Sequence, residues 1–245
     1  MRKSSLVIGR QPVMEALQSG KALDKIWIQK NISGELIEDI KRLARQQQVP
    51  VQPVPVEKLN GFSRANHQGV IAMAALVQYM DVQDVVDFVV GKGEVPLFLM
   101  LDGITDVRNI GAIARSAVCC GAQAMIIPDK GVGALNEEAM KSSAGALQHI
   151  HICRVNSLLK AVDTLHYNGI QVLTSEMRAE TELSSLDFAI PSCIILGDEG
   201  KGVQPYLAKA ADRFFSIPMK GKFDSFNVSV AAGIILYEAM MKRRS

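Results

Sequence analysis

The stretch LFLMLDGITDVRNIGAIAR, residues 97–115, decides how this chain folds. It opens with five apolar residues, Leu97 to Leu101, which favour a strand buried on both faces. A polar turn follows, and then a helical pattern of small apolar residues over about 110–121. A buried strand followed by a helix is the repeating unit of α/β proteins. We therefore predict an α/β fold with a parallel sheet covered by helices on both faces.

The same alternation continues to the end of the chain. Short apolar runs predict strands, and the longer segments between them have helical spacing. The predicted strands are 124–127, 171–174, 193–196 and 214–217, and the predicted helices are 136–147, 158–168, 204–211 and 228–243. These elements make residues 97–245 one domain.

The first third of the chain shows a second, smaller α/β pattern. Helices are predicted at 13–18 and 36–48, and extended segments at 25–29, 49–56 and 69–77. Residues 81–90 have the pattern of a connecting helix that ends at Gly91 and Gly93. We therefore expect a domain over 1–78, a linker with a connecting helix over 79–96, and a domain over 97–245.

Composition excludes several classes of protein. The chain has 245 residues, of which 48% are hydrophobic and 21% charged, an ordinary globular balance. No apolar run approaches the roughly 20 residues that span a bilayer, and the start lacks the apolar core of a signal peptide. The four cysteines lack zinc spacing, so we expect them to be small buried hydrophobes. A cytoplasmic protein without a metal or a membrane partner is expected.

Basic residues are concentrated in the first third. Residues 1–78 carry 11 Lys and Arg against 6 Asp and Glu, whereas residues 79–245 carry 16 against 19. The net charges are therefore +5 and −3. Such an asymmetry indicates either an anionic partner at the first domain or a solvated surface of mixed sign.

The first of three polar junctions follows the strand at 97–101. In open α/β sheets, ligands collect at the carboxyl ends of the strands. Asn109 is expected to be the N-cap of the next helix. Arg115 lies in the second turn of that helix, among small apolar residues, so its charge must pair or face a cleft. The alternative for Arg115 is a buried structural ion pair.

Two further junctions follow the strands at 193–196 and 214–217. In the second, Gly197, Gly200 and Gly202 would let the backbone approach a ligand closely. Neither the dinucleotide pattern G-x-G-x-x-G nor the phosphate loop is present, which disfavours a nicotinamide dehydrogenase. In the third, Ser225 and Asn227 are expected caps of the last helix. A glycine, two lysines and Ser229 accompany these caps, so this cluster predicts a site.

In this order, the three junctions resemble the signature motifs of the SpoU branch of the SPOUT RNA methyltransferases. The motif residues of the family stand at Asn109, Arg115, Glu199, Ser225, Asn227 and Ser229. The segment Asn66 to Val70 resembles the end of the substrate-binding domain of the RlmB/TrmH group. Two positions depart from the family pattern, because Val107 stands in place of a proline and Phe226 in place of a leucine.

The resemblance implies an S-adenosylmethionine-dependent RNA ribose 2′-O-methyltransferase. It implies a ribosomal-protein-like α/β/α domain at the N-terminus and a deep trefoil knot in the C-terminal domain. The implied catalytic residues are Arg115, Asn109, Glu199, Ser225 and Asn227, with the proton acceptor open between Arg115 and Glu199. The implied cofactor contacts are Thr174, Leu196, Gly197, Gly202, Ile217, Met219, Ser225, Phe226 and Asn227. The implied RNA contacts are Arg10, Arg64, His67 and Gln68.

The expected substrate is a guanosine of 23S ribosomal RNA. A tRNA 2′-O-methyltransferase of the same family is the alternative, and a non-catalytic RNA-binding protein is the alternative from another class. The last helix is apolar nearly all round, so one face against its own sheet cannot bury it. A homodimer would cover the rest, as the resemblance also implies, whereas in a monomer the threaded loop of a knot would cover it.

Overall fold

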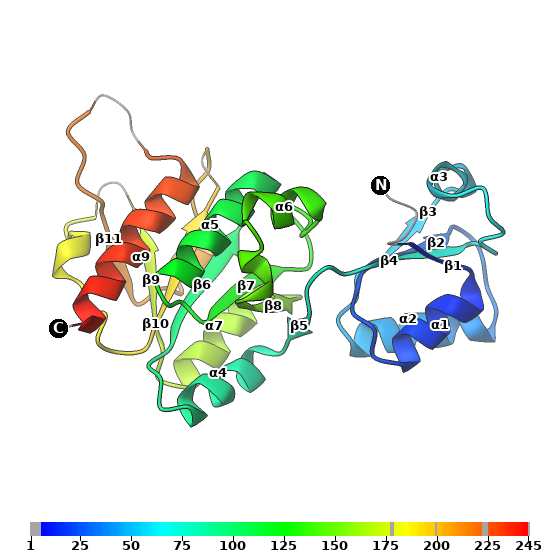
Figure 1. Ribbon diagram of the computed structural model, residues 1–245, viewed down its shortest axis with the longest axis horizontal. Coiled ribbons are helices and arrows are strands. Elements are labelled where there is room, and N and C mark those ends of the chain that lie inside the picture. Colours follow the sequence, from blue (N-terminus) through cyan, green and yellow to red (C-terminus); the bar gives the residue numbers. More distant parts are fainter. Residues whose placement is uncertain (1–5, 177–178, 199, 222–224, 245) are drawn as a thin grey trace. The chain divides into compact units, whose positions relative to one another are not determined.

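The computed structural model describes residues 6–176, 179–198, 200–221 and 225–244. Figure 1 shows the chain as two α/β parts, which form the compact units Met1–Gln78 and Tyr79–Ser245. Among the described residues, no helix is long and apolar enough to cross a membrane, and no group of three His, Cys, Asp or Glu side chains could hold a metal ion.

The second unit is built on a seven-stranded sheet in the order β11-β9-β10-β6-β7-β8-β5. Every pairing in it is parallel, which confirms the predicted parallel sheet. The strands are β5 (Tyr79–Met80), β6 (Leu97–Asp102), β7 (Ala124–Pro128), β8 (His151–Val155), β9 (Gln171–Ser175), β10 (Ser192–Gly197) and β11 (Arg213–Phe215). The central strand, β6, is buried along its whole length.

Helices cover both faces of this sheet. On one face, α4 (Val82–Gly91), α7 (Leu158–Tyr167) and α8 (Pro205–Ala208) share a core with Phe98 and Met100 of β6. Because side chains alternate along a strand, the fully buried Leu97, Leu99 and Leu101 face the other way. The remaining helices are α5 (Val107–Cys119), α6 (Glu137–Ser142) and α9 (Val228–Arg244), and α5 contacts both α6 and α9 (Figure 1).

The first unit has a four-stranded mixed sheet in the order β1-β4-β2-β3. Its strands are β1 (Leu6–Ile8), β2 (Leu23–Gln29), β3 (Val51–Val54) and β4 (Val70–Ala74). The helices α1 (Arg10–Gln18) and α2 (Glu35–Gln46) pack on one face, around Ile26, Ile28, Val70 and Ala72. Trp27 and Ile71 point to the other face, where they pack with Leu59 of α3 (Val56–Phe62).

The structure differs from the expected elements at several places. The expected linker, 79–96, supplies β5 and α4, because Val82, Val85, Val86 and Val89 are buried in the core of the second unit. The expected helix 136–147 stops at Ser142, since Ala144 and Gly145 have positive φ angles of 50° and 86°. A 3-10 turn, η2 (Ala146–Gln148), follows. Strand β8 and helix α3 were not predicted.

The four cysteines differ in their exposure to solvent. Cys153 and Cys193 are buried as expected, and burial raises the pKa of the Cys153 thiol to about 12. The expectation was wrong for Cys119, which is exposed, and Cys120 is half-buried. Both lie where α5 ends, so one side of the helix end faces solvent.

Candidate functional site

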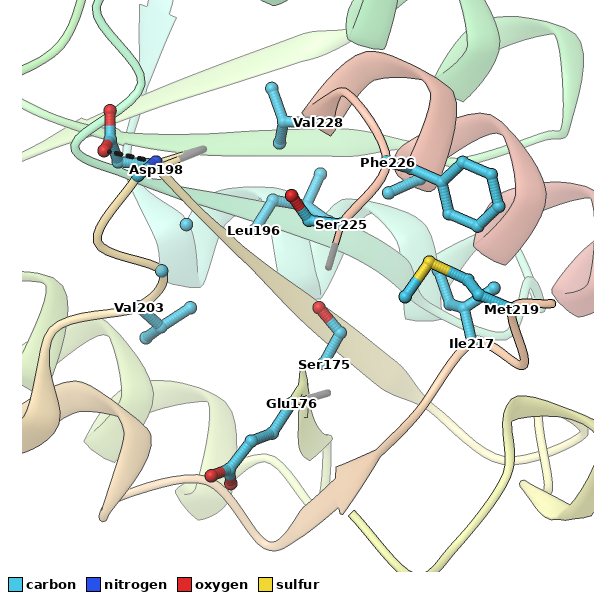
Figure 2. Close-up of a pocket in the computed structure, with 14 residues that line it drawn as sticks. Ser175, Glu176, Leu196, Asp198, Val203, Ile217, Met219, Ser225, Phe226 and Val228 are labelled. Carbon is cyan, nitrogen blue, oxygen red and sulfur yellow. Dashed lines mark hydrogen bonds between the residues drawn. The ribbon is translucent and has the colours of Figure 1, made fainter. Parts of the chain in front are cut away.

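A cavity of about 330 Å³ lies at the carboxyl ends of β9 and β10 (Figure 2). This volume falls in the usual range for a small-molecule site. Its lining is mainly apolar, with a few polar groups. The lining residues are Ser175, Glu176, Leu196, Gly197, Asp198, Gly200, Gly202, Val203, Ile217, Met219, Ser225, Phe226, Val228 and Ala231.

One wall of the cavity is a backbone loop that folds against itself. A Cβ atom at Gly197 would lie 2.2 Å from the carbonyl carbon of Gly202, so only glycine fits there. Asp198 pairs with Gly202, and its Oδ1 accepts hydrogen bonds from the amides of Gly200 (3.0 Å) and Lys201 (3.1 Å). Because glycine has no side chain, Gly197, Gly200 and Gly202 line the cavity with main-chain atoms.

Asp102 fastens this loop to the end of β6. Its buried carboxylate accepts hydrogen bonds from the backbone amide and the side-chain amide of Gln204, both at 2.7 Å. The first and second junctions are thus joined by a residue that sequence reasoning missed. The signal was an acidic residue directly after a fully apolar strand, where a carboxylate must find donors.

The N-cap of α5 is Asp106, and the expectation that Asn109 caps this helix is wrong. The Asp106 carboxylate accepts a hydrogen bond of 2.8 Å from the backbone amide of Arg108. Its hydrogen bonds with the Arg108 side chain hold the pKa of Asp106 below its usual value. Aspartate caps as well as asparagine, and the two candidates are three positions apart in the sequence. Asn109 therefore does not cap the helix and lies inside its first turn.

The first and third junctions meet through side-chain amides. The Nδ2 of Asn227 donates a hydrogen bond of 3.2 Å to the Oδ1 of Asn109. The Oδ1 of Asn227 accepts from the backbone amide (2.9 Å) and the hydroxyl (2.6 Å) of Ser229. Asn227 is therefore the N-cap of α9, as predicted, and its side chain also reaches α5.

Arg115 is exposed on α5 and does not line the cavity. Within the described ranges its guanidinium forms no hydrogen bond or ion pair. The alternative of a buried structural ion pair is therefore wrong, because α5 turns this side chain outward. Arg115 remains a cation that is available to a ligand outside the cavity.

Most of the predicted cofactor contacts gather in the cavity. Leu196, Gly197, Gly202, Ile217, Met219, Ser225 and Phe226 line it, whereas Thr174 and Asn227 do not. Thr174 is buried, and its Oγ1 has no hydrogen-bond partner among the described residues. Glu199 lies outside the described residues. Ser175 and Glu176, at the end of β9, line the cavity and were missed, although their place after a predicted strand was a usable signal.

The predicted RNA contacts of the first unit lie in the segment 64–68 and at the start of α1. The Nε of Arg10 donates a hydrogen bond of 2.9 Å to the carbonyl of Gln68. His67 is buried, and its Nδ1 accepts from the amide of Gly69 at 2.9 Å. Its Nε2 therefore carries the proton and donates to Asn60 at 2.9 Å. His67 thus shapes the segment, while Arg64 and Gln68 are exposed on it.

Two family models match the chain. The SpoU rRNA Methylase family matches residues 96–237, and a family described as RNA 2'-O ribose methyltransferase substrate binding matches residues 6–80. A Staphylococcus haemolyticus protein assigned to the TrmH family of tRNA/rRNA methyltransferases is 36% identical over 97% of this chain and 96% of its own length. The Bacillus subtilis protein YacO, assigned to the same family, is 34% identical over 97% and 95%.

Solved structures share the fold. The SpoU methyltransferase AviRb from Streptomyces viridochromogenes, in complex with AdoMet, superimposes with a TM-score of 0.61 at 22% identity, covering 98% of this chain and 90% of its own. The TrmH/SpoU tRNA modifying enzyme of A. aeolicus gives a TM-score of 0.55 at 25% identity, covering 66% of this chain and 84% of its own. The second likeness covers a smaller part of this chain than the first.

Proposed function

The chain belongs to the SpoU family of RNA methylases, and from this membership we propose that it methylates the ribose 2′-hydroxyl of a guanosine in 23S ribosomal RNA. It is an S-adenosylmethionine-dependent RNA 2′-O-ribose methyltransferase. The observation that carries the proposal is the cavity at β9 and β10, where seven predicted cofactor contacts meet beside the Asn109–Asn227 pair. A family match over both units accompanies it.

The residues of the cavity fit an adenosine group. Leu196, Ile217, Met219 and Phe226 provide apolar surface for a flat base, and the loop at Gly197 exposes main-chain groups that can bind its polar edge. Ser225 adds a hydroxyl to the lining. When bound, S-adenosylmethionine supplies an electrophilic methyl group at its sulfonium.

The polar residues beside the cavity suit the handling of a ribose. Arg115 presents a planar donor set that can clamp an RNA phosphate, and a cation there lowers the pKa of a neighbouring hydroxyl. Asn109 and Asn227 hold each other in one orientation and can position the ribose or Arg115. The proton acceptor is either Arg115 or Glu199. Arg115 is the less suitable base, because a guanidinium loses its proton only above about pH 12.

The first unit is proposed to bind the RNA. Its net charge of +5 attracts phosphate, and Arg10 is anchored through Nε while its other donors remain available to a ligand. Arg64 and Gln68 are the exposed members of the predicted contacts, and His67 contributes by holding their segment. The proposed domain architecture is ribosomal-protein-like, with helices on both faces of the small sheet.

We also propose that the second unit is knotted, with α9 threaded through a loop. The last residues of α9 are bound to segments that precede two central strands. Arg243 donates hydrogen bonds to the carbonyls of Val95 and Pro96 before β6, and of Phe188 before β10. Lys242 donates to Ser184 and Leu186 in the same stretch. These hydrogen bonds to two segments that are distant in the sequence support a threaded arrangement.

The outer side of α9 supports a homodimer. Val230, Tyr237 and Met241 are 50%, 58% and 43% exposed, and their spacing places them on one side of the helix. Three large apolar side chains in a row form the kind of patch that protein interfaces cover. A second copy, related by a two-fold axis, would bury this stripe.

The substrate is tested by supplying labelled cofactor and two RNAs to the purified protein. We expect methyl transfer to 23S ribosomal RNA, because the first unit matches a substrate-binding family and carries the basic excess. Transfer to tRNA alone would replace this proposal with the tRNA enzyme. Transfer to neither, with the cofactor bound, would favour the non-catalytic RNA-binding protein.

A further inference from the structure

We propose that Glu176 recognises the ribose of S-adenosylmethionine by accepting hydrogen bonds from its two adjacent hydroxyls. This inference rests on the proposed function and adds a residue that determines which nucleoside the cavity accepts. Glu176 lines the cavity at the carboxyl end of β9, next to Ser175. The three junctions that hold the family motifs do not include it.

Among the described lining residues, Glu176 offers a carboxylate whose two oxygens both remain available as acceptors. The other carboxylate in the described lining belongs to Asp198, whose Oδ1 already accepts from the amides of Gly200 and Lys201. Over the described ranges, the Glu176 side chain makes no hydrogen bond or ion pair. A carboxylate has acceptor capacity for two neighbouring hydroxyl donors.

The backbone holds the base of this side chain in place. The amide of Glu176 donates to the carbonyl of Phe215 at 2.8 Å, and its carbonyl accepts from Ala179 at 3.1 Å. The first bond continues the β9–β11 pairing beyond Ser175, and the second closes a turn after Glu176. In Figure 2 the side chain extends away from Met219 and Phe226, so the carboxylate leaves the apolar wall free for the base.

The position is comparable to one in the dinucleotide-binding α/β fold, although the glycine pattern of that fold is absent here. There, an acidic residue that follows the glycine loop in the sequence binds a ribose hydroxyl. Here the glycine loop follows β10, and Glu176 directly follows β9, which pairs with β10. The glycine loop and Glu176 therefore lie side by side at the carboxyl ends of these strands.

Calorimetric titration of the full-length protein tests the inference without measuring activity. The probes are S-adenosylhomocysteine, its 2′-deoxy and 3′-deoxy analogues, and 5′-methylthioadenosine, which keeps the ribose but lacks the amino acid. We expect the unaltered protein to bind the parent about tenfold to a hundredfold more tightly than either deoxy analogue. In Glu176→Ala this gap should fall to about twofold, and Glu176→Gln should be intermediate.

The matched control is Glu180→Ala, which removes the same charge from an exposed residue of the same loop outside the cavity lining. It should keep the full gap. A gap that persists in Glu176→Ala overturns the inference. So does a loss confined to S-adenosylhomocysteine and absent for 5′-methylthioadenosine, because the carboxylate would then bind the ammonium group. If the unaltered protein binds none of the probes, the proposed function fails instead.

Discussion

The side-chain amide of Asn227, at the start of α9, donates a hydrogen bond of 3.2 Å to the side-chain oxygen of Asn109 on α5. The two residues are 118 positions apart in the sequence. The other end of the Asn227 amide is held by the backbone and the hydroxyl of Ser229, so rotation of the amide would break three hydrogen bonds. This link fixes the first junction against the third.

We predict that Asn109→Ala and Asn227→Ala act as one unit. Each should lower kcat/KM by about tenfold or more, because a residue that loses its partner also loses its orientation. The double variant should be little worse than the poorer single variant, since coupled residues are not additive. Steady-state kinetics of the four proteins measures the coupling. Effects that multiply would show that the two amides act independently. Asn156→Ala, at an exposed position, serves as the control.

Arg115 is predicted to be needed for methyl transfer and not for cofactor binding. Arg115→Ala and Arg115→Lys should both abolish methylation, because lysine keeps the charge but loses the planar two-pronged donor set. Cofactor affinity should stay within a few fold, since Arg115 does not line the cavity. Arg108→Lys on the same helix should keep activity, as its ion pair with Asp106 is exposed. Substantial activity in Arg115→Lys would show that a point charge suffices.

Val107 departs from the family pattern, and the structure predicts that proline would be accepted there. Val107 is the first residue of α5, where proline is favoured because its amide needs no helical partner. The preceding residue, Asp106, has a ψ angle of 112°, which a following proline allows. Val107→Pro should therefore raise stability by about 0.4–1 kcal/mol. A thermal melt checks this, and a lower melting temperature would indicate that loss of the Val107 side chain outweighs the gain.

Thr174→Val tests whether the buried hydroxyl of Thr174 only lowers stability or also contacts the cofactor. Thr174 Oγ1 has no hydrogen-bond partner among the described residues, and such a group costs about 1–3 kcal/mol. Valine has nearly the same shape and suits a strand, so the variant should be more stable by about 1 kcal/mol. Cofactor affinity should be unchanged, because Thr174 does not line the cavity. Weaker binding of the cofactor would instead support the contact that the resemblance implies.

The parallel sheet could be predicted because its strands are apolar runs bounded by turns. The runs at Leu97, Ala124, Gln171 and Cys193 all became strands close to the predicted bounds. Strand β8 could not, because Arg154 interrupts its apolar run, and that side chain is buried over the ring of Tyr79. A charged residue inside a strand is unexpected until the tertiary contact is known.

Site residues could be predicted where their role depends on neighbours in the sequence, as for the glycine at Gly197 and the helix cap at Asn227. They could not be predicted where the reason is a distant partner. Asp102 binds Gln204 across 102 positions, and Glu176 enters the cavity only because β9 lies beside β10. The predicted N-cap of α5 was wrong because Asp106 and Asn109 have equal capping chemistry. Only the hydrogen bonds in the structure show which of the two is the cap.

The proposed methylation of a ribose 2′-hydroxyl in 23S ribosomal RNA is tested most directly by mapping these methyl groups in cells. Cells with the gene should carry one 2′-O-methylguanosine in 23S RNA that is absent when the gene is deleted. Restoring the unaltered gene should restore this mark, and restoring Arg115→Ala should not. An unchanged 23S map with a missing 2′-O-methyl group in tRNA would contradict the account.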